Sequence, residues 1–217
     1  MKSKSKFIVL SLIAIMLIVA VISQHCKKPE KPEKQYEATW ESLKTHSLPE
    51  WFDDAKFGIF IHWGLYSVPA YKTEWYPMHM YTEGHDIYNH HTKEYGPPWE
   101  FGYKDFLPRF TAENWDPDRW AELFKEAGAR YVVPVAEHHD GFAMWDSDLT
   151  EWDAMDKGPQ RDIIGELEKA VRKLDMKYAP SYHRARNWRH YEPSYNLEKE
   201  CDTEDPQFAG IDGIYPE

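Results

Sequence analysis

Short apolar runs alternate with amphipathic helical segments along most of this chain, and that alternation constrains the fold more than any other feature. The apolar runs predict buried strands at residues 57–61, 131–136 and 176–182, although the last two each contain a proline. One helix is predicted after Asp116 and another after Asp162. Strands that alternate with helices pair in parallel through right-handed crossovers. We therefore predict an α/β fold around a parallel sheet.

Both predicted helices carry the expected signals at their ends. Asp116 and Asp162 are good N-cap residues, because a carboxylate accepts hydrogen bonds from the free N–H groups of the first turn. Pro117 suits the first helical position, and Gly128 ends the first helix. The predicted apolar faces comprise Trp120, Leu123, Phe124 and Ala127 in the first helix, and Ile164, Leu167, Val171 and Leu174 in the second. The stretch 65–114 is rich in Tyr, His, Pro and Gly and is predicted to be a long irregular loop.

Each of the three predicted strands is followed by histidine. His62 follows the first strand, His138 and His139 follow the second, and His183 follows the third. The carboxyl ends of parallel strands meet at one edge of the sheet, where ligands bind in such folds. These histidines therefore predict a functional site. Adjacent strand residues point to opposite faces, so strand geometry by itself keeps at most one of His138 and His139 in it.

Each candidate also has a structural explanation. His62 taken alone fits a core histidine bonded to a backbone carbonyl, and the sequence from His138 to Gly141 fits a tight turn. Glu74, Trp75 and Tyr76 are either an ordinary loop cluster or a sugar-binding corner, in which an acid stands beside two aromatic rings. We interpret four nearby aspartates as a solvated acidic loop without a role: Asp146, Asp148, Asp153 and Asp156.

Two classes of function are open to a chain with such a cluster of histidines and aromatic residues. A zinc hydrolase needs three protein ligands and an open position, but the usual His-x-His pair is absent, since Trp63 and Gly64 follow His62. A surface carbohydrate-binding lipoprotein would explain the ten Trp and fourteen Tyr, but explains less easily the polar groups at the strand ends. The net charge of −11 argues against nucleic-acid binding.

The N-terminus carries an export signal. Three lysines precede an apolar run, so we predict that residues 1–25 are a signal peptide or signal anchor. Cys26 then precedes a linker of Pro and charged residues (26–39), an arrangement that resembles a bacterial lipoprotein acylated at that Cys. The alternatives are an uncleaved anchor and simple secretion. All three predict a periplasmic, cell-surface or secreted protein that contacts the membrane only through its N-terminus.

Several motifs occur in a familiar order from about Trp40 to Trp188: FGIFIHWG, then EWY, HHDGF and KGPQRDIIGEL. This region resembles glycoside hydrolase family 29, the α-L-fucosidases. The resemblance implies a (β/α)₈ catalytic barrel followed by a small β-sandwich, with retaining exo-hydrolysis of terminal α-L-fucose from a fucosylated glycan or glycoconjugate. It implies no cofactor and no metal. By motif match, the fucose hydroxyls and ring would be bound by His62, Glu74, Trp75, His138 and His139.

The sequence departs from the family at the third strand. Many members carry a Tyr-Tyr-Ser type sequence there, with a tyrosine that contacts the sugar. Here Ser181 stands at that position and is followed by Tyr182 and His183, which resembles a branch of the family with Ser-His-Arg-Ala. We add Tyr182 and His183 to the candidate substrate-binding residues.

The second departure from the family concerns the two carboxyl groups that a retaining glycosidase needs for catalysis. In the family the nucleophilic Asp ends the fourth strand, and the acid/base follows later, so we expect both beyond Glu217. Asp212 and Gly213 resemble that motif only superficially, since no apolar strand precedes them. A closed barrel takes about 250 residues and eight strands. We therefore expect residues 40–217 to be an incomplete (β/α)₈ TIM barrel of three to four strands, truncated before closure and inactive by itself.

Overall fold

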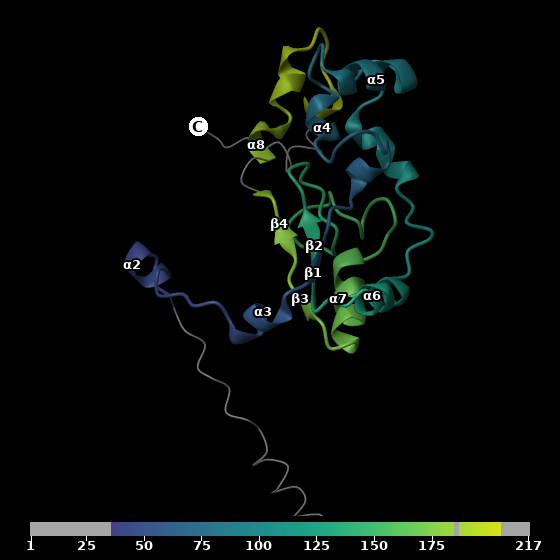
Figure 1. The fold of residues 1–217 in the computed structure, drawn as a ribbon. Helices are drawn as coiled ribbons and strands as arrows, with labels where there is room; N and C mark the ends of the chain where they lie inside the picture. Colours follow the sequence, from purple (N-terminus) through teal and green to yellow (C-terminus); the bar gives the residue numbers. More distant parts are fainter. Residues whose placement is uncertain (1–35, 185–186, 205–217) are drawn as a thin grey trace, which may run out of the picture. The chain divides into compact units, whose positions relative to one another are not determined.

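The computed structural model describes residues 36–184 and 187–204 (Figure 1). The chain divides into one unit of residues 1–48 and another of residues 49–217. Helix α2 (Trp40–Leu43) belongs to the first unit, where the Thr39 hydroxyl accepts from the N–H of Ser42. The predicted signal segment, Cys26 and the Asp212–Gly213 motif lie outside the described residues. Among the helices that the structure does describe, none is long and apolar enough to cross a membrane.

A parallel sheet forms the centre of the second unit. Its strands are β1 (Gly58–Ile61), β2 (Tyr131–Glu137), β3 (Lys177–Tyr178) and β4 (Ser181–Tyr182). The order is β1-β2-β3, with β4 also paired to β2, and every pairing is parallel. The predicted parallel α/β sheet is therefore confirmed.

The third predicted strand is divided into β3 and β4. The Ala179 N–H still bonds to the Val132 carbonyl, but Pro180 has no N–H to continue the ladder. Pairing resumes at Ser181, opposite Val135, and the register shifts before Tyr182 meets Glu137. The prediction of one continuous strand over 176–182 was therefore wrong at its proline.

The two predicted helices occur where their caps placed them. Helix α6 (Pro117–Glu126) begins after Asp116, and helix α7 (Ile163–Lys173) begins after Asp162, whose side chain accepts from the N–H of Gly165. The predicted face of α7 is confirmed, because Ile164, Leu167 and Val171 are buried and Leu174 is half-buried.

The predicted face of α6 is only partly correct. Leu123 is 52 % exposed and Ala127 is also exposed, whereas Ala121 is fully buried. The short side chain of Ala121 lets α6 approach its neighbours closely, and Trp120 and Phe124 pack against the core beside it. The buried face of α6 is therefore rotated from the one that the spacing of its apolar residues predicted.

The stretch 65–114 contains more regular structure than we predicted. Its helices are η1 (Leu65–Ser67), α4 (Tyr76–His79), α5 (Asp86–Tyr95) and η2 (Tyr103–Arg109). They are short and rich in Tyr and His, so their apolar periodicity is weak, and buried aromatic side chains such as Tyr76 and Phe106 hold them. Four further short helices complete the described chain: α3 (Glu50–Ala55), α8 (Asn187–His190), η4 (Glu192–Asn196) and η5 (Asp202–Glu204).

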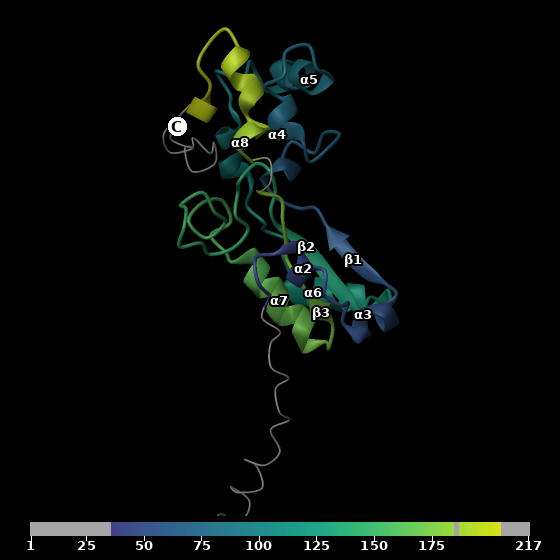
Figure 2. The ribbon, with the colours of Figure 1, turned by 90° about the vertical axis from the view of Figure 1, so that its left-hand side faces the viewer.

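Helices α4 and α5 of this stretch, together with α8, lie beyond the carboxyl ends of the strands. Figure 1 shows α4, α5 and α8 at the end of the sheet toward which β2 and β4 point, and the view in Figure 2 agrees. Hydrogen bonds tie this layer to the strand ends: the Tyr103 hydroxyl donates to Asp140 (2.7 Å) and the Tyr191 hydroxyl donates to the Asp140 carbonyl (3.1 Å). Hydrogen bonds therefore hold this helical layer against the edge of the sheet where the functional site is predicted.

Candidate functional site

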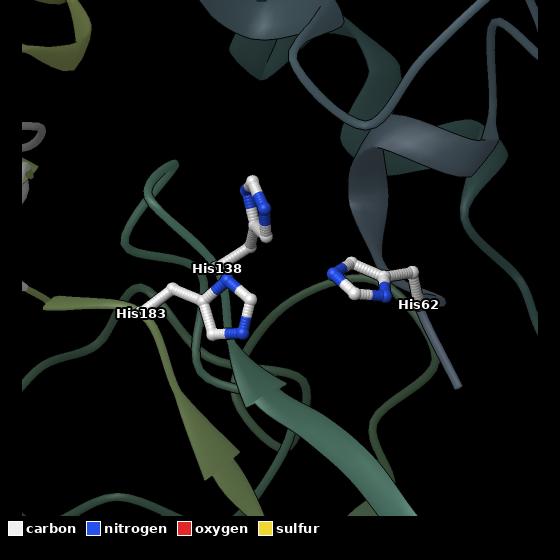
Figure 3. A group of neighbouring side chains, drawn as sticks. All are labelled: His62, His138 and His183. Carbon is white, nitrogen blue, oxygen red and sulfur yellow. The ribbon is translucent and has the colours of Figure 1, made fainter. Parts of the chain in front are cut away.

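Three imidazole rings from three strand ends meet at one place. The ring centroid of His138 lies 5.7 Å from that of His62 and 4.8 Å from that of His183, and the remaining pair is 5.3 Å apart (Figure 3). One ring nitrogen of each histidine lies within 4.8 Å of the other two. The expectation that the strand-end histidines lie close together is confirmed.

His139 also belongs to this cluster. Its ring lies 4.8 Å from His138 and 5.5 Å from His183. Strand alternation predicted only one of the pair here, but β2 ends at Glu137, so neither residue is in the pleat. Both belong to a turn closed by the Gly141 N–H and the His138 carbonyl, with Gly141 in the left-handed region (φ +72°). A turn can present successive side chains to the same side.

Glu74 and Trp75 complete the set that the motif match indicated. The Trp75 ring lies 4.9 Å from His139 and 6.0 Å from His138. Glu74 accepts from the Thr73 hydroxyl (2.8 Å) and lines a cavity of about 350 Å³ together with His62. A carboxylate, an indole and several imidazoles thus face the same region, which is a combination suited to a polyhydroxylated ligand with an apolar face.

Burial keeps the His138 imidazole neutral. Burial and then the neighbouring His139, His183 and His62 together lower the pKa of His138 to about 3. The pKa of His183 is lowered by burial and then by His62 and His139. For Glu74, partial burial raises the pKa, but hydrogen bonds to the carboxylate and the nearby His62 and His138 bring it below its usual value. At neutral pH the His138 and His183 rings are therefore neutral and the Glu74 carboxylate is ionised.

Two further acidic residues next to the cluster are engaged elsewhere. Glu137 is buried and forms an ion pair with Arg184 (2.8 Å). Asp140 is 1 % exposed and accepts from the Tyr103 hydroxyl and the Phe142 N–H. Burial raises the pKa of Asp140 to about 7, although those two hydrogen bonds act in the opposite direction. Asp140 therefore stabilises the turn that contains His138 and His139.

Sequence reasoning missed two residues of the site. The His190 ring lies 5.6 Å from Trp75 and 5.8 Å from His139 and is 1 % exposed, and among the described residues neither of its ring nitrogens has a hydrogen-bond partner. The Tyr66 ring lies 5.2 Å from His138, and its buried hydroxyl has no hydrogen-bond partner in the part of the chain that the structure describes. Tyr66 follows His62 by four residues, which was a usable signal, whereas nothing near His190 resembles a strand end.

Tyr182 lies apart from the cluster. Its ring packs edge-on against Trp145 (5.5 Å) and is 54 % exposed, and no ring contact joins it to the histidines within the described part of the chain. Tyr182 is the residue before His183 in the chain, and successive residues of an extended segment point to opposite sides. Of the two residues added at the third strand, the structure brings only His183 to the site.

One aspartate of the predicted acidic loop is not solvated. Asp153 is 1 % exposed, and its Oδ1 accepts from the N–H groups of Met155 and Asp156 (2.8 Å each). The interpretation of Asp153 as a surface residue was therefore wrong, because its carboxylate organises the turn that follows it. Asp146, Asp148 and Asp156 are exposed as predicted.

These features define a mixed α/β protein with an imidazole-rich site at the carboxyl ends of parallel strands. The sequence model of the Alpha-L-fucosidase family matches residues 22–211. The tissue alpha-L-fucosidase of Bos taurus is 44 % identical over 193 residues, which cover 88 % of this chain and 40 % of the bovine protein. The plasma alpha-L-fucosidase of Homo sapiens is 43 % identical over 156 residues, which cover 71 % of this chain and 33 % of the human protein. The chain belongs to the α-L-fucosidase family.

Solved structures agree with this assignment. Thermotoga maritima alpha-fucosidase in complex with fucose is 45 % identical and superposes with a TM-score of 0.64, covering 68 % of this chain and 37 % of that one. The same enzyme in complex with a mechanism-based inhibitor gives the same values. The matched part of the present chain spans 33–41 % of the length of these curated relatives.

Proposed function

We propose that the strand-end site binds a terminal α-L-fucose residue of a glycan, as part of a fucosidase catalytic domain. The observation that carries the proposal is the convergence of His62, His138 and His183 with Glu74 and Trp75 in a member of this family. Imidazoles and a carboxylate can bond sugar hydroxyls directionally, and the Trp75 ring can cover the apolar face of the sugar.

We further propose that these 217 residues bind fucose without cleaving it. A retaining glycosidase needs a carboxylate nucleophile about 5–5.5 Å from a carboxylic acid/base. Glu74 is the acid that shares the cavity with His62, while Glu137 is ion-paired and Asp140 is bonded to Tyr103. The described residues thus offer no evident pair of reactive acids. Measurable turnover of nitrophenyl α-L-fucoside by the purified chain would refute this part of the proposal.

An incomplete barrel remains our proposal for the fold. β1 lies at the edge of the sheet over the described residues, and Phe60 on this strand is 54 % exposed. Such an edge is the kind that a further strand covers in a closed barrel. Residues 40–217 would then supply the opening strands and the sugar-binding half of the site.

Fucose binding is the direct test. We expect L-fucose to bind the purified chain in isothermal titration calorimetry or saturation-transfer NMR. His62→Ala and His138→Ala should each weaken binding about tenfold, because each removes a hydrogen bond of about 1–1.5 kcal/mol. The control is His46→Ala, an exposed histidine of the first unit, which should leave binding unchanged. L-rhamnose, another 6-deoxyhexose with a different arrangement of hydroxyls, is the control sugar and should bind more weakly than L-fucose.

Unchanged fucose affinity in the double variant His62→Ala/His138→Ala would show that the sugar binds elsewhere. Circular dichroism of each variant separates loss of the site from loss of the fold. Equal affinity for L-rhamnose would mean that the hydroxyls are not recognised individually.

We also propose export with lipidation at Cys26, supported by the lysines, the apolar run and the Pro-rich linker of the sequence. Expression in a bacterium fed with labelled palmitate should label the native chain but not Cys26→Ser. Label that persists in Cys26→Ser would overturn the lipid anchor, and retention of both proteins in the cytoplasm would overturn export.

A further inference from the structure

His62, His138 and His183 have the arrangement of a metal-binding triad as well as that of a sugar site. Each histidine follows a different strand, and one nitrogen of each lies within 4.8 Å of the other two. Figure 3 shows the three rings grouped around a common space. The rings meet at interplanar angles of 45–75°, so they are not stacked on one another. Their nitrogens can therefore approach a shared point.

The separation of the nitrogens is close to what a zinc ion requires. Tetrahedral zinc with bonds of about 2.0–2.1 Å holds its nitrogen ligands roughly 3.4 Å apart. The nitrogens therefore need to approach one another by up to about 1.4 Å. His62 is exposed and His183 is half-buried, so their side chains have room to rotate, while His138 is buried. Over residues 36–184 and 187–204, the Nδ1 atom of His138 has no hydrogen-bond partner.

Neighbouring groups favour a divalent cation at this point. The Ser181 hydroxyl lies 3.1 Å from Nε2 of His183 and can orient that ring, as outer-sphere groups do around metal-bound histidines. Glu74 lies on the same side as His62 and shares its cavity. The chain carries a net charge of −11, which attracts cations in general. Three imidazoles with an open position are the ligand set of zinc or a similar transition metal.

We propose that His62, His138 and His183 bind a divalent transition-metal ion, with Zn²⁺ as the reference, and that this ion and a sugar exclude each other from the site. The second half of this statement rests on the proposed fucose site; the first half does not. The ion would occupy the position that the sugar hydroxyls take between the rings. Micromolar zinc or copper would then act as a competitive inhibitor of fucose binding.

The test is a titration of the full 217-residue chain with ZnCl₂ at pH 7, after removal of bound metal with a chelator. We expect one Zn²⁺ whose affinity falls at least tenfold in His62→Gln and again in His183→Gln. The matched control is His46→Gln, which should bind Zn²⁺ as the native chain does. The pair His79 and His85, whose rings stack at 4.1 Å, is a second control for weak surface binding. Co²⁺ as the probe adds a visible spectrum that reports a tetrahedral nitrogen site.

The outcomes separate the two halves of the proposal. If the native chain and the variant His62→Gln/His183→Gln bind Zn²⁺ equally, the metal site is overturned and the fucose proposal is unaffected. If Zn²⁺ binds as expected but saturating L-fucose leaves its affinity unchanged, the metal site stands and the exclusion is overturned. If L-fucose fails to bind at all, the proposed function and the exclusion that rests on it both fail, and the metal site is judged by the Zn²⁺ titration of the variants. A Zn²⁺ affinity that drops in both the variants and the fucose-saturated chain supports the whole proposal.

Discussion

Asp140 makes the stability of this chain depend on pH in a direction that can be worked out from its surroundings. The carboxyl group is 1 % exposed, and burial raises its pKa from 3.8 to about 7 in the folded chain. In the unfolded chain it should titrate near the ordinary value of about 3.9. Between these two values the folded chain holds a proton that the unfolded chain has released.

The sign follows from this difference in bound protons. Below about pH 3 the carboxyl group is protonated in both states, so the free energy of unfolding does not change with its titration. As pH rises toward 7, the unfolded state binds fewer protons than the folded state, so stability falls. A pKa difference of about three corresponds to about 4 kcal/mol, which is a large part of the 5–15 kcal/mol typical of a domain.

Asp140→Asn removes this dependence. An amide keeps an acceptor for the Phe142 N–H and can donate to the Tyr103 hydroxyl, but it has no proton to lose. We expect the variant to gain about 4 kcal/mol over the native chain between pH 4 and pH 8, measured by urea unfolding followed through tryptophan fluorescence. Asp148→Asn, on the exposed loop, is the control and should show no such gain.

Other groups also titrate in this range but cancel in the comparison. Burial lowers the pKa of His138 and His190, so each makes stability rise with pH as the unfolded histidine loses its proton near 6.5. Both histidines are present in the native chain and in Asp140→Asn. Stability curves of the two proteins that run parallel from pH 4 to 8 would therefore contradict the reasoning about Asp140.

Three more predictions concern single contacts. Asp162→Ala removes the acceptor for the Gly165 N–H and should lower the free energy of unfolding by about 1 kcal/mol in urea titrations, with no change in fucose affinity. Gly58→Ala places a Cβ within 2.1–2.4 Å of the Tyr131 ring, so we expect a loss of roughly 1–3 kcal/mol by the same measurement, and unchanged stability would mean that the ring moves freely. Phe60→Lys replaces an exposed apolar side chain on the edge strand β1, so aggregation measured by light scattering should decrease. An unchanged light-scattering signal would mean that the chain aggregates through a different surface.

The parts of the fold that depend on short stretches of sequence were predictable. Asp116 and Asp162 fix where α6 and α7 begin, because each side chain accepts a hydrogen bond from an N–H only three residues further along the chain. The strands are likewise predicted by short apolar runs, which are local features of the sequence. Pro180 indicated in the sequence where the third strand could be interrupted. The resulting division into β3 and β4 was visible only in their pairing with β2.

Features that depend on distant contacts were not predictable. The helix α5 is held by buried side chains such as His91, whose ring bonds to the Tyr76 hydroxyl and the Phe101 carbonyl. His190 reaches Trp75 only because α8 folds back over the strand ends, more than a hundred residues later in the chain. The exposure of Leu123 likewise depends on which side of α6 its neighbours occupy.

The division of the third strand has a consequence for how copies of this chain meet. β1 offers four consecutive residues along one margin of the sheet, whereas β3 and β4 offer two each, separated by a proline that cannot donate. An extended segment from another molecule would find a continuous template on the first margin and an interrupted one on the second. Growth of any chain-to-chain ladder should therefore start at β1, and a proline introduced there would make the two margins equally poor templates.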